Sequence, residues 1–392
     1  MNPKYNNMQN ISKVTDCYGC SVCAVACGRR AITMQLNVDG FYAPIVDKSK
    51  CVDCGVCLDI CAFNDSNVKQ DKGFPLSSYA VWSNDDNIRH RSTSGGVAFE
   101  LGRYLLQKGY AVIGCRYNSD KHIAEHYLAE TEEDLKASVG SKYIQSYTID
   151  GFSQIRKGQK YLIIGTPCQI DSLRRYIQKR KIENDVILLD FFCHGIPSML
   201  MWKQYLKELE QKIGDIDNIV WRDKETGWHD SYVMKVVDRY SSWFSKGDLF
   251  FQMFLGDRCL GKACYENCKY KYNNSAADIR IGDLWGRTYE KDEYGVNGVV
   301  CFTQKGLDLL NEMSSVLHIE SSSLEIVGES QMKKCAHKPI SYKYVMKHLK
   351  KGTSLSQIHK IASHIELFER IPRKVKYYIK RFPSKLSEIL KR

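Results

Sequence analysis

From about Leu76 onward, short apolar runs alternate with segments whose apolar residues recur at helical spacing. The runs SYAVW, YAVIGCRY, YLIIG and VILLDFF have the length and the β-branched content of strands. Between them, VAFELGRYLLQKG, a segment that begins near Gln169, and PSMLMWKQYLKELEQKIG are predicted helices. This alternation predicts an α/β domain with a largely parallel sheet.

The first seventy residues follow a different pattern. Here AITMQL, NVDG and FYAPIVD predict a strand, a turn and a second strand between two cysteine-rich blocks. The polar, turn-rich stretch NDSNVKQDKG, residues 64–73, predicts a linker.

The two cysteine blocks share the spacing C-x2-C-x2-C-x3-C. In bacterial ferredoxins this double pattern binds two [4Fe-4S] clusters, and the fourth cysteine of each run ligates the other cluster. The spacing therefore predicts a first set of cluster ligands, Cys17, Cys20, Cys23 and Cys61. It predicts a second set, Cys51, Cys54, Cys57 and Cys27.

Paired CxxC motifs also have the spacing of zinc ligands, so two zinc sites are the alternative. The third cysteine in each tight triplet favours a cubane cluster over zinc. Gly28 and Ala62 stand where the ferredoxin pattern has proline, which donates nothing to iron. We expect three parts: an α+β ferredoxin-like module (1–72), the α/β domain (73–340) and a basic helical tail (341–392).

Composition narrows the class of protein. The 392 residues include 43% apolar residues and 16 cysteines, and the N-terminus lacks the apolar core of a signal peptide. We therefore expect a cytoplasmic protein whose thiols bind metal or carry out redox chemistry. Nearly all of the net charge of +12 lies between Ile340 and Arg392, with fourteen Lys and Arg against three Asp and Glu. A nucleic-acid-binding protein would spread its cations over the body, so no nucleic-acid partner is expected.

The α/β domain carries a third group of cysteines. Cys168 and Cys193 follow two predicted parallel strands, whose carboxyl ends share one sheet edge, where such folds bind ligands. Cys264 and Cys268 follow in ACYENC, and together the four predict a third set of ligands. Cys259 is a substitute for either of the last two. Isolated cysteines are otherwise small buried hydrophobes, which is the interpretation for Cys115, Cys301 and Cys335.

Two loops suit an anion or a flavin. Ser94, Gly95 and Gly96 open a predicted helix, where free N–H groups favour a phosphate, although SGG is also an ordinary loop sequence. The loop GSKYIQS, residues 140–146, adds a lysine, two hydroxyls and a tyrosine; its alternative is a solvated turn. His194, beside Cys193, is either a proton donor or a core histidine.

Several motifs occur in the order typical of one family. RSTSGGVAFELGRYLLQKGYAVIG, SKYIQS, GTPCQIDSL, DFFCHGIPS, CYENCKYK and ADIRIGDLWG resemble the coenzyme F420 hydrogenase/dehydrogenase beta subunit family over residues 76–340. A fused ferredoxin module is common in this family. The stretch WRDKETGW, residues 221–228, resembles the bacterial branch associated with polysaccharide biosynthesis. The late cysteine pair departs from the family, because three residues rather than two separate Cys264 from Cys268.

The resemblance implies a third [4Fe-4S] cluster on the third set and an FAD beside it. By position it implies that ten residues contact the flavin: Ser94, Gly95, Gly96, Ser141, Lys142, Tyr143, Gln145, Ser146, Thr166 and Gln169. The implied activity is electron exchange between a one-electron carrier such as ferredoxin and a small-molecule acceptor, which is F420 in archaeal members. The alternative is an electron-transfer subunit that serves a partner enzyme.

The tail contains two amphipathic segments, residues 354–370 and 372–382. The second places Val375, Tyr378, Ile379 and Phe382 among Lys and Arg, a composition that suits peripheral contact with an anionic membrane. The alternative is a helix docked on the domain with a solvated basic face.

Overall fold

The computed structural model describes residues 9–65, 67–69, 75–329, 331 and 333–370. Its strands are β1 (Ile32–Leu36), β2 (Tyr42–Val46), β3 (Ser77–Ser83), β4 (Ala111–Asn118), β5 (Ile123–Ala129), β6 (Ser146–Tyr147), β7 (Tyr161–Ile164), β8 (Val186–Phe191), β9 (Val220–Arg222), β10 (Tyr232–Val236), β11 (Tyr240–Trp243), β12 (Ile279–Asp283), β13 (Asn297–Cys301) and β14 (Leu317–Ser321).

The α-helices are α1 (Val22–Val25), α2 (Val56–Asp59), α3 (Asp86–Arg91), α4 (Val97–Gln107), α5 (Glu132–Lys136), α6 (Ile149–Phe152), α7 (Pro167–Arg180), α8 (Met199–Ile213), α9 (Leu249–Leu255), α10 (Lys262–Glu266), α11 (Gln304–Glu312), α12 (Leu324–Val327), α13 (Tyr342–Lys350) and α14 (Leu355–Arg370). Short 3-10 turns are η2 (Ile11–Lys13), η3 (Ala62–Asn64), η4 (Glu183–Asp185), η5 (Phe244–Lys246) and η6 (Arg287–Tyr289).

A nine-stranded sheet forms the centre of the α/β part, in the order β14-β3-β13-β12-β8-β7-β4-β5-β6. The neighbours β12, β8, β7 and β4 run parallel, as do β5 and β6, whereas the other four pairs are antiparallel. The α/β class is thus confirmed, but the sheet is mixed rather than largely parallel. One reason is that the connection from β4 to β5 spans only residues 119–122, too short for the crossover that a parallel pair needs.

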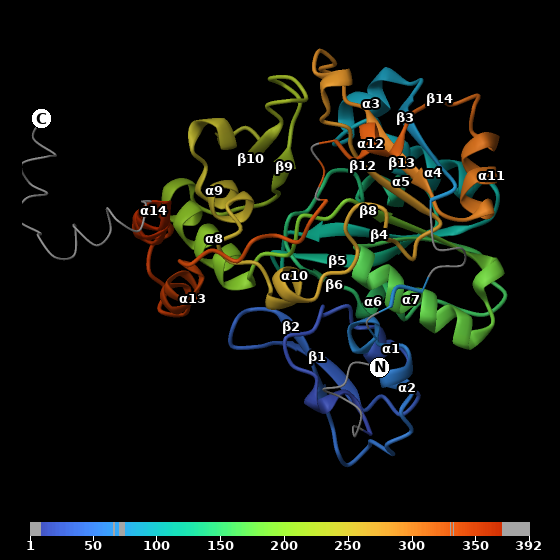
Figure 1. Ribbon diagram of the computed structural model, residues 1–392, viewed down its shortest axis with the longest axis horizontal. Helices are drawn as coiled ribbons and strands as arrows, with labels where there is room; N and C mark the ends of the chain where they lie inside the picture. The colour runs from blue at the N-terminus through green and yellow to red at the C-terminus, as the bar shows by residue number, and fades with distance from the viewer. Residues whose placement is uncertain (1–8, 66, 70–74, 330, 332, 371–392) are drawn as a thin grey trace, which may run out of the picture.

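Helices cover both faces of this sheet (Figure 1). On one face, α4 packs Val97, Leu101 and Leu105 against Val112 and its neighbours. On the other face, α7 packs Ile170, Leu173 and Ile177 against apolar side chains of β7 and β8. The N-terminal module, with β1 and β2 paired antiparallel, lies beyond α6 and α7 on this second face.

A second lobe beside the sheet contains the three-stranded sheet β11-β10-β9 together with α8, α9, α13 and α14 (Figure 1). Helix α14 corresponds to the first predicted tail segment and packs Leu355, Ile358 and Ala362 into the core of this lobe. Arg258 binds Glu366 of this helix at 2.7 Å, so the docked alternative describes this segment. The second tail segment lies outside the described residues, among which no helix is long and apolar enough to cross a membrane.

Candidate functional site

The two cysteine blocks of the N-terminal module fold as a local repeat. In each block the backbone is left-handed two residues after the first cysteine, at Gly19 and Asp53, and directly after the second, at Ser21 and Gly55. A short helix follows in both cases, α1 in the first block and α2 in the second. Equal cysteine spacing therefore yields two loops of the same shape.

The first set surrounds a cavity. Its four cysteines line the cavity together with apolar side chains that include Ile11, Met34, Ile60 and Phe63. Burial, joined by the charges of neighbouring thiolates, raises the pKa of both Cys17 and Cys61 to about 12. Such thiols stay protonated until a metal displaces the proton, so the cavity fits a group that brings its own positive charge.

The second set lies closer to the surface. Cys54 is exposed, whereas Cys57 is buried and feels the charges of Cys54 and Cys51, which add to burial in raising its pKa. The backbone N–H of Ala31 donates to the sulfur of Cys27 at 3.3 Å. Across the described part of the chain, no three Cys, His, Asp or Glu side chains converge closely enough to hold a single metal ion.

The third set comes together at the carboxyl ends of β7 and β8, which are adjacent and parallel. Burial raises the pKa of Cys168 strongly, and the charges of Cys193 and Cys264 add to this effect. Cys264 likewise feels Cys193 and Cys268, and its pKa rises to about 12. Each of the four predicted cysteines therefore lies close enough to at least two others for their charges to interact.

Two further cysteines, Cys259 and Cys335, lie in environments unlike that of the third set. Cys259 is fully buried in the apolar core of the second lobe, where burial is the main cause of its raised pKa and no other cysteine contributes. Cys335, interpreted from the sequence as a small buried hydrophobe, is instead exposed, and its Sγ donates to the carbonyl oxygen of Cys268 at 3.0 Å. Sequence spacing offered no signal for this contact.

Helix α7 carries one member of the third set and contacts one member of the first. This helix begins at Pro167, directly before Cys168, and Ser172 lies one turn beyond Cys168 on the same face. The thiol of Cys20 lies 3.3 Å from the hydroxyl oxygen of Ser172. One helical turn, roughly 5.4 Å, therefore separates a member of the third set from a contact of the first.

Lys271 lies against the third set. Its ammonium donates to the carbonyl oxygens of Cys193 at 2.6 Å and His194 at 3.0 Å. Its charge partly offsets the burial that raises the pKa of Cys193 to about 11. His194 itself binds Asp257 at 2.8 Å through Nε2, and its buried Nδ1 has no partner in the described structure.

The residues implied to bind flavin form two groups. In the first, Ser94 donates to the carbonyl of Val296 at 2.7 Å, and the backbone N–H of Ser141 donates to Thr93 Oγ1 at 3.0 Å. A side chain at Gly95 would approach the carbonyl of Val81 to 2.5 Å, so only glycine fits this position. Gly96 begins α4 in the left-handed conformation.

Two cations that the sequence reasoning missed complete this first group. Arg222 donates to Tyr143 Oη and pairs with Asp283, each at 3.0 Å, and its guanidinium lies over the rings of Tyr232 and Trp285. Lys224 donates to the carbonyl of Ser94 at 2.7 Å, and burial lowers its pKa to about 7. Both residues lie in WRDKETGW, the stretch whose resemblance to the family could have drawn attention to them.

The second group leads to the third set. Gln169 Nε2 donates to Ser146 Oγ at 3.1 Å, and Gln169 Oε1 accepts the N–H of Thr166 at 2.8 Å. The Thr166 hydroxyl lies 3.2 Å from the sulfur of Cys168. Gln145 turns to the module instead, where it accepts the N–H of Tyr42 at 2.9 Å.

Lys142 belongs to neither group. Its ammonium donates to the carbonyls of Ala137, Ser138 and Val139, and burial lowers its pKa to about 8. These three carbonyls use the three donors of the ammonium group. Lys142 therefore stabilises the end of α5, and its role with a flavin stays a prediction.

Comparison with known proteins covers the same regions. Residues 158–326 match the C terminus of the coenzyme F420 hydrogenase/dehydrogenase beta subunit family, and residues 78–150 match the N terminus of the same family. Residues 16–64 match a 4Fe-4S dicluster domain, which confirms the iron–sulfur prediction for the module.

A similar solved structure is a chain of the F420-reducing [NiFe] hydrogenase complex from Methanosarcina barkeri, with 15% identity and a TM-score of 0.47. The match covers 74% of this chain and 91% of that one. A search of curated proteins finds no match.

Proposed function

Because this chain belongs to the coenzyme F420 hydrogenase/dehydrogenase beta subunit family and carries a 4Fe-4S dicluster domain, we propose that it is an iron–sulfur flavoprotein oxidoreductase. The observation that carries the proposal is the adjacency of Cys168 and Ser172 on α7, with Ser172 in contact with Cys20. This arrangement supports passage of electrons from the module to the third set.

A flavin supplies the step that clusters lack, because it stores two electrons and delivers them with a proton as a hydride. Two electrons taken singly from a reduced carrier then balance one hydride given to an organic acceptor. The residues assigned to the cofactors are the three cysteine sets and the two groups around Ser94 and Thr166. Lys224 would hold the loop at Ser94, and Arg222 would place a positive charge beside it.

Trp228 lies in the apolar cluster that contains Val296, whose carbonyl oxygen accepts the Ser94 hydroxyl. Its buried indole N–H has no acceptor within the residues that the structure describes, and its ring stacks on Trp285 at a centroid distance of 4.6 Å. Such a donor favours a ligand with acceptor atoms.

The first test is the content of iron, sulfide, zinc and flavin in anaerobically purified protein. About twelve irons, from three four-iron clusters, and one FAD per chain would support the proposal. About eight irons without flavin would refute the third cluster and the flavin. Zinc in place of iron would refute the redox function.

The loop at Gly95 offers a second test of the flavin assignment. In Gly95→Ala the new methyl group meets the carbonyl of Val81, an overpacking that costs about 1–3 kcal/mol and displaces the loop. We expect reduced flavin content with full iron content. Gly28→Ala, whose methyl group would meet open space, is the matched control and should retain both.

A second candidate function is an electron-transfer subunit that delivers electrons to a partner enzyme, which the family's description as a beta subunit favours. Reoxidation of the reduced protein distinguishes the two. Reoxidation by a small molecule alone, with F420 and precursors of polysaccharides as the two classes to try, would support the enzyme. Reoxidation only with a partner protein would support the subunit.

A further inference from the structure

The segment that follows Cys268 joins the module to the α/β domain. Lys269, the next residue, donates from Nζ to the carbonyl oxygens of Ala62 at 2.9 Å, Asp65 at 2.5 Å and Asn67 at 2.8 Å. These carbonyls belong to the segment that follows Cys61, the last member of the first set. Lys269 therefore connects the segment after Cys268, in the third set, to the segment after Cys61, in the first set.

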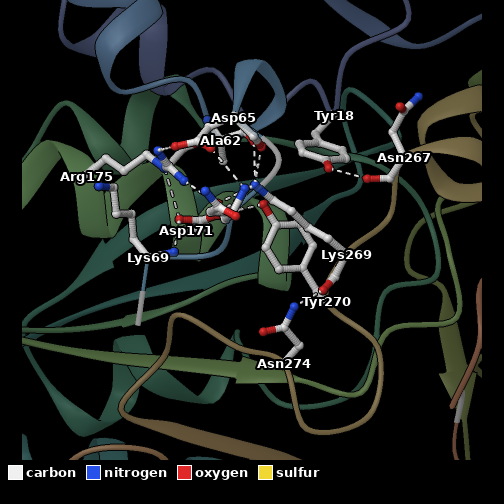
Figure 2. A network of polar contacts seen from close by, with 12 residues as sticks. Tyr18, Ala62, Asp65, Lys69, Asp171, Arg175, Asn267, Lys269, Tyr270 and Asn274 are labelled. Carbon is white, nitrogen blue, oxygen red and sulfur yellow. Dashed lines mark hydrogen bonds and ion pairs between the residues drawn. The ribbon is translucent and has the colours of Figure 1, made fainter. Parts of the chain in front are cut away.

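A buried carboxylate neutralises this lysine. Asp171 on α7 is fully buried and lies 3.5 Å from Lys269 Nζ, and it accepts hydrogen bonds from Arg175 at 3.1 Å and Tyr270 at 2.9 Å (Figure 2). Arg175 in turn donates to Asp65 at 3.0 Å. Because each charge is paired, the network is fixed in one arrangement, and breaking one pair would leave a buried charge uncompensated.

Tyr18 closes the contact on the other side. This residue lies between Cys17 and Cys20, and its hydroxyl donates to the carbonyl oxygen of Asn267 at 2.6 Å, directly before Cys268. Its ring contacts the rings of Phe63 and Tyr270 at centroid distances of 5.1 and 5.7 Å. Both ends of the first set are thus tied to the loop that carries Cys268.

We propose that Lys269 is a positioning residue that fixes the separation between the first and third cysteine sets and so controls the passage of electrons between them. The inference rests on the proposed function, because it requires a cluster on each set. Lys269 acts by holding the backbone after Cys61.

A second ion pair across the same boundary provides a control. Lys179 on α7 binds Asp59 of the module at 2.7 Å, but the two side chains are 45% and 53% exposed. Exposed pairs contribute little to a fixed geometry, because solvent screens them. Lys179→Met therefore removes a lysine from the same interface without disturbing the buried network.

The experiment compares Lys269→Met, Lys269→Arg and Lys179→Met with the wild-type chain, each as the full cofactor-loaded protein. Dithionite is the reductant, and rapid-mixing spectroscopy follows reduction of the module and then of the flavin. Electron paramagnetic resonance records the magnetic interaction between neighbouring reduced clusters.

We expect Lys269→Met to slow passage from the module to the flavin severalfold, because the rate of electron transfer falls exponentially as the separation between the centres grows. The magnetic interaction should weaken while iron and flavin content stay unchanged. Lys269→Arg should recover part of the rate, and Lys179→Met should match wild type. Equal rates in Lys269→Met and Lys179→Met would overturn the inference.

If Lys269→Met loses iron, Arg175→Lys takes its place, since it keeps the charge but loses the two-pronged contact to Asp65 and Asp171. Passage in Arg175→Lys as fast as in Lys179→Met would also overturn the inference. A wild-type chain without the third cluster or flavin would instead refute the proposed function, so the two failures are distinguishable.

Discussion

The sulfur of Cys20 lies 3.3 Å from the hydroxyl oxygen of Ser172, although 152 positions separate the two residues in the chain. The same oxygen accepts the backbone N–H of Ala62 at 3.3 Å. The hydroxyl hydrogen is thus free to point toward the sulfur when Cys20 is a ligating thiolate. Ser172 is therefore placed to stabilise extra negative charge on a cluster in the first set.

Removal of this hydroxyl should lower the reduction potential of that cluster. Hydrogen bonds to cluster sulfur favour the more negative, reduced state, so Ser172→Ala disfavours it. We expect a shift on the order of tens of millivolts, the equivalent of about 1 kcal/mol for a one-electron couple. Potentiometric titration followed by electron paramagnetic resonance measures it.

Ser49→Ala is the control for this prediction. Ser49 belongs to the same module, but its hydroxyl donates to Asp47 at 2.6 Å on the exposed surface. Its removal should leave all potentials unchanged. A Ser172→Ala protein with wild-type potentials would show that the contact with Cys20 has no electronic consequence.

The last ligand of the third set can be identified by two substitutions. Cys268 interacts with both Cys193 and Cys264, whereas Cys335 contacts the Cys268 backbone and is exposed. We expect Cys268→Ser to lose about four irons per chain and Cys335→Ser to lose none. Iron analysis of both variants decides between them, and the reverse pattern would assign Cys335 as the ligand.

Lys271 should raise the potential of a cluster on the third set. Its positive charge opposes the effect of burial on the pKa of Cys193 and Cys264, and a reduced cluster is more negative than an oxidised one. In Lys271→Met we therefore expect a lower potential at unchanged iron content. The exposed Lys333, whose ammonium lies over the ring of Tyr272, supplies the charge-matched control Lys333→Met. A potential that falls equally in both variants would contradict a local effect.

Local patterns in the sequence predicted much of this molecule correctly. The strands β7 and β8 and the helices α4, α7 and α8 appear where apolar periodicity placed them. The spacing of the cysteines predicted the iron–sulfur module, since ligand geometry is encoded over a few residues. The capping box of α7, in which Thr166 and Gln169 bind reciprocally, explains why that helix begins where it does.

Contacts between distant segments could not be predicted in this way. The antiparallel additions at the sheet edges depend on which strands meet, and α13 precedes both of the amphipathic segments that were predicted in the tail. Lys269 directly follows Cys268, and Ser172 lies one helical turn after Cys168. The partners of both residues nevertheless come from the N-terminal part of the chain. A buried carboxylate such as Asp171 looks like any surface residue until the fold surrounds it.

Because of the buried His126, we expect the free energy of unfolding to fall in acid. The residue is buried on β5, its Nε2 lies 2.9 Å from the carbonyl oxygen of Ile164, and burial lowers its pKa from 6.5 to about 4. Between these two values the unfolded chain binds a proton that the folded chain does not. The free energy of unfolding therefore falls as pH drops below 6.5, by about 1 kcal/mol at pH 5.5.

In His126→Gln, which keeps an N–H donor but does not titrate, we expect this loss between pH 7 and pH 5.5 to shrink by about 1 kcal/mol. Urea unfolding of anaerobic protein at several pH values measures the difference in slope, and any constant cost of the substitution cancels. The exposed His337 supplies the control His337→Gln, which should retain the wild-type slope. Parallel pH profiles for His126→Gln and wild type would mean that His126 takes up its proton in the folded chain as readily as in the unfolded one, and hence that burial is not what governs it.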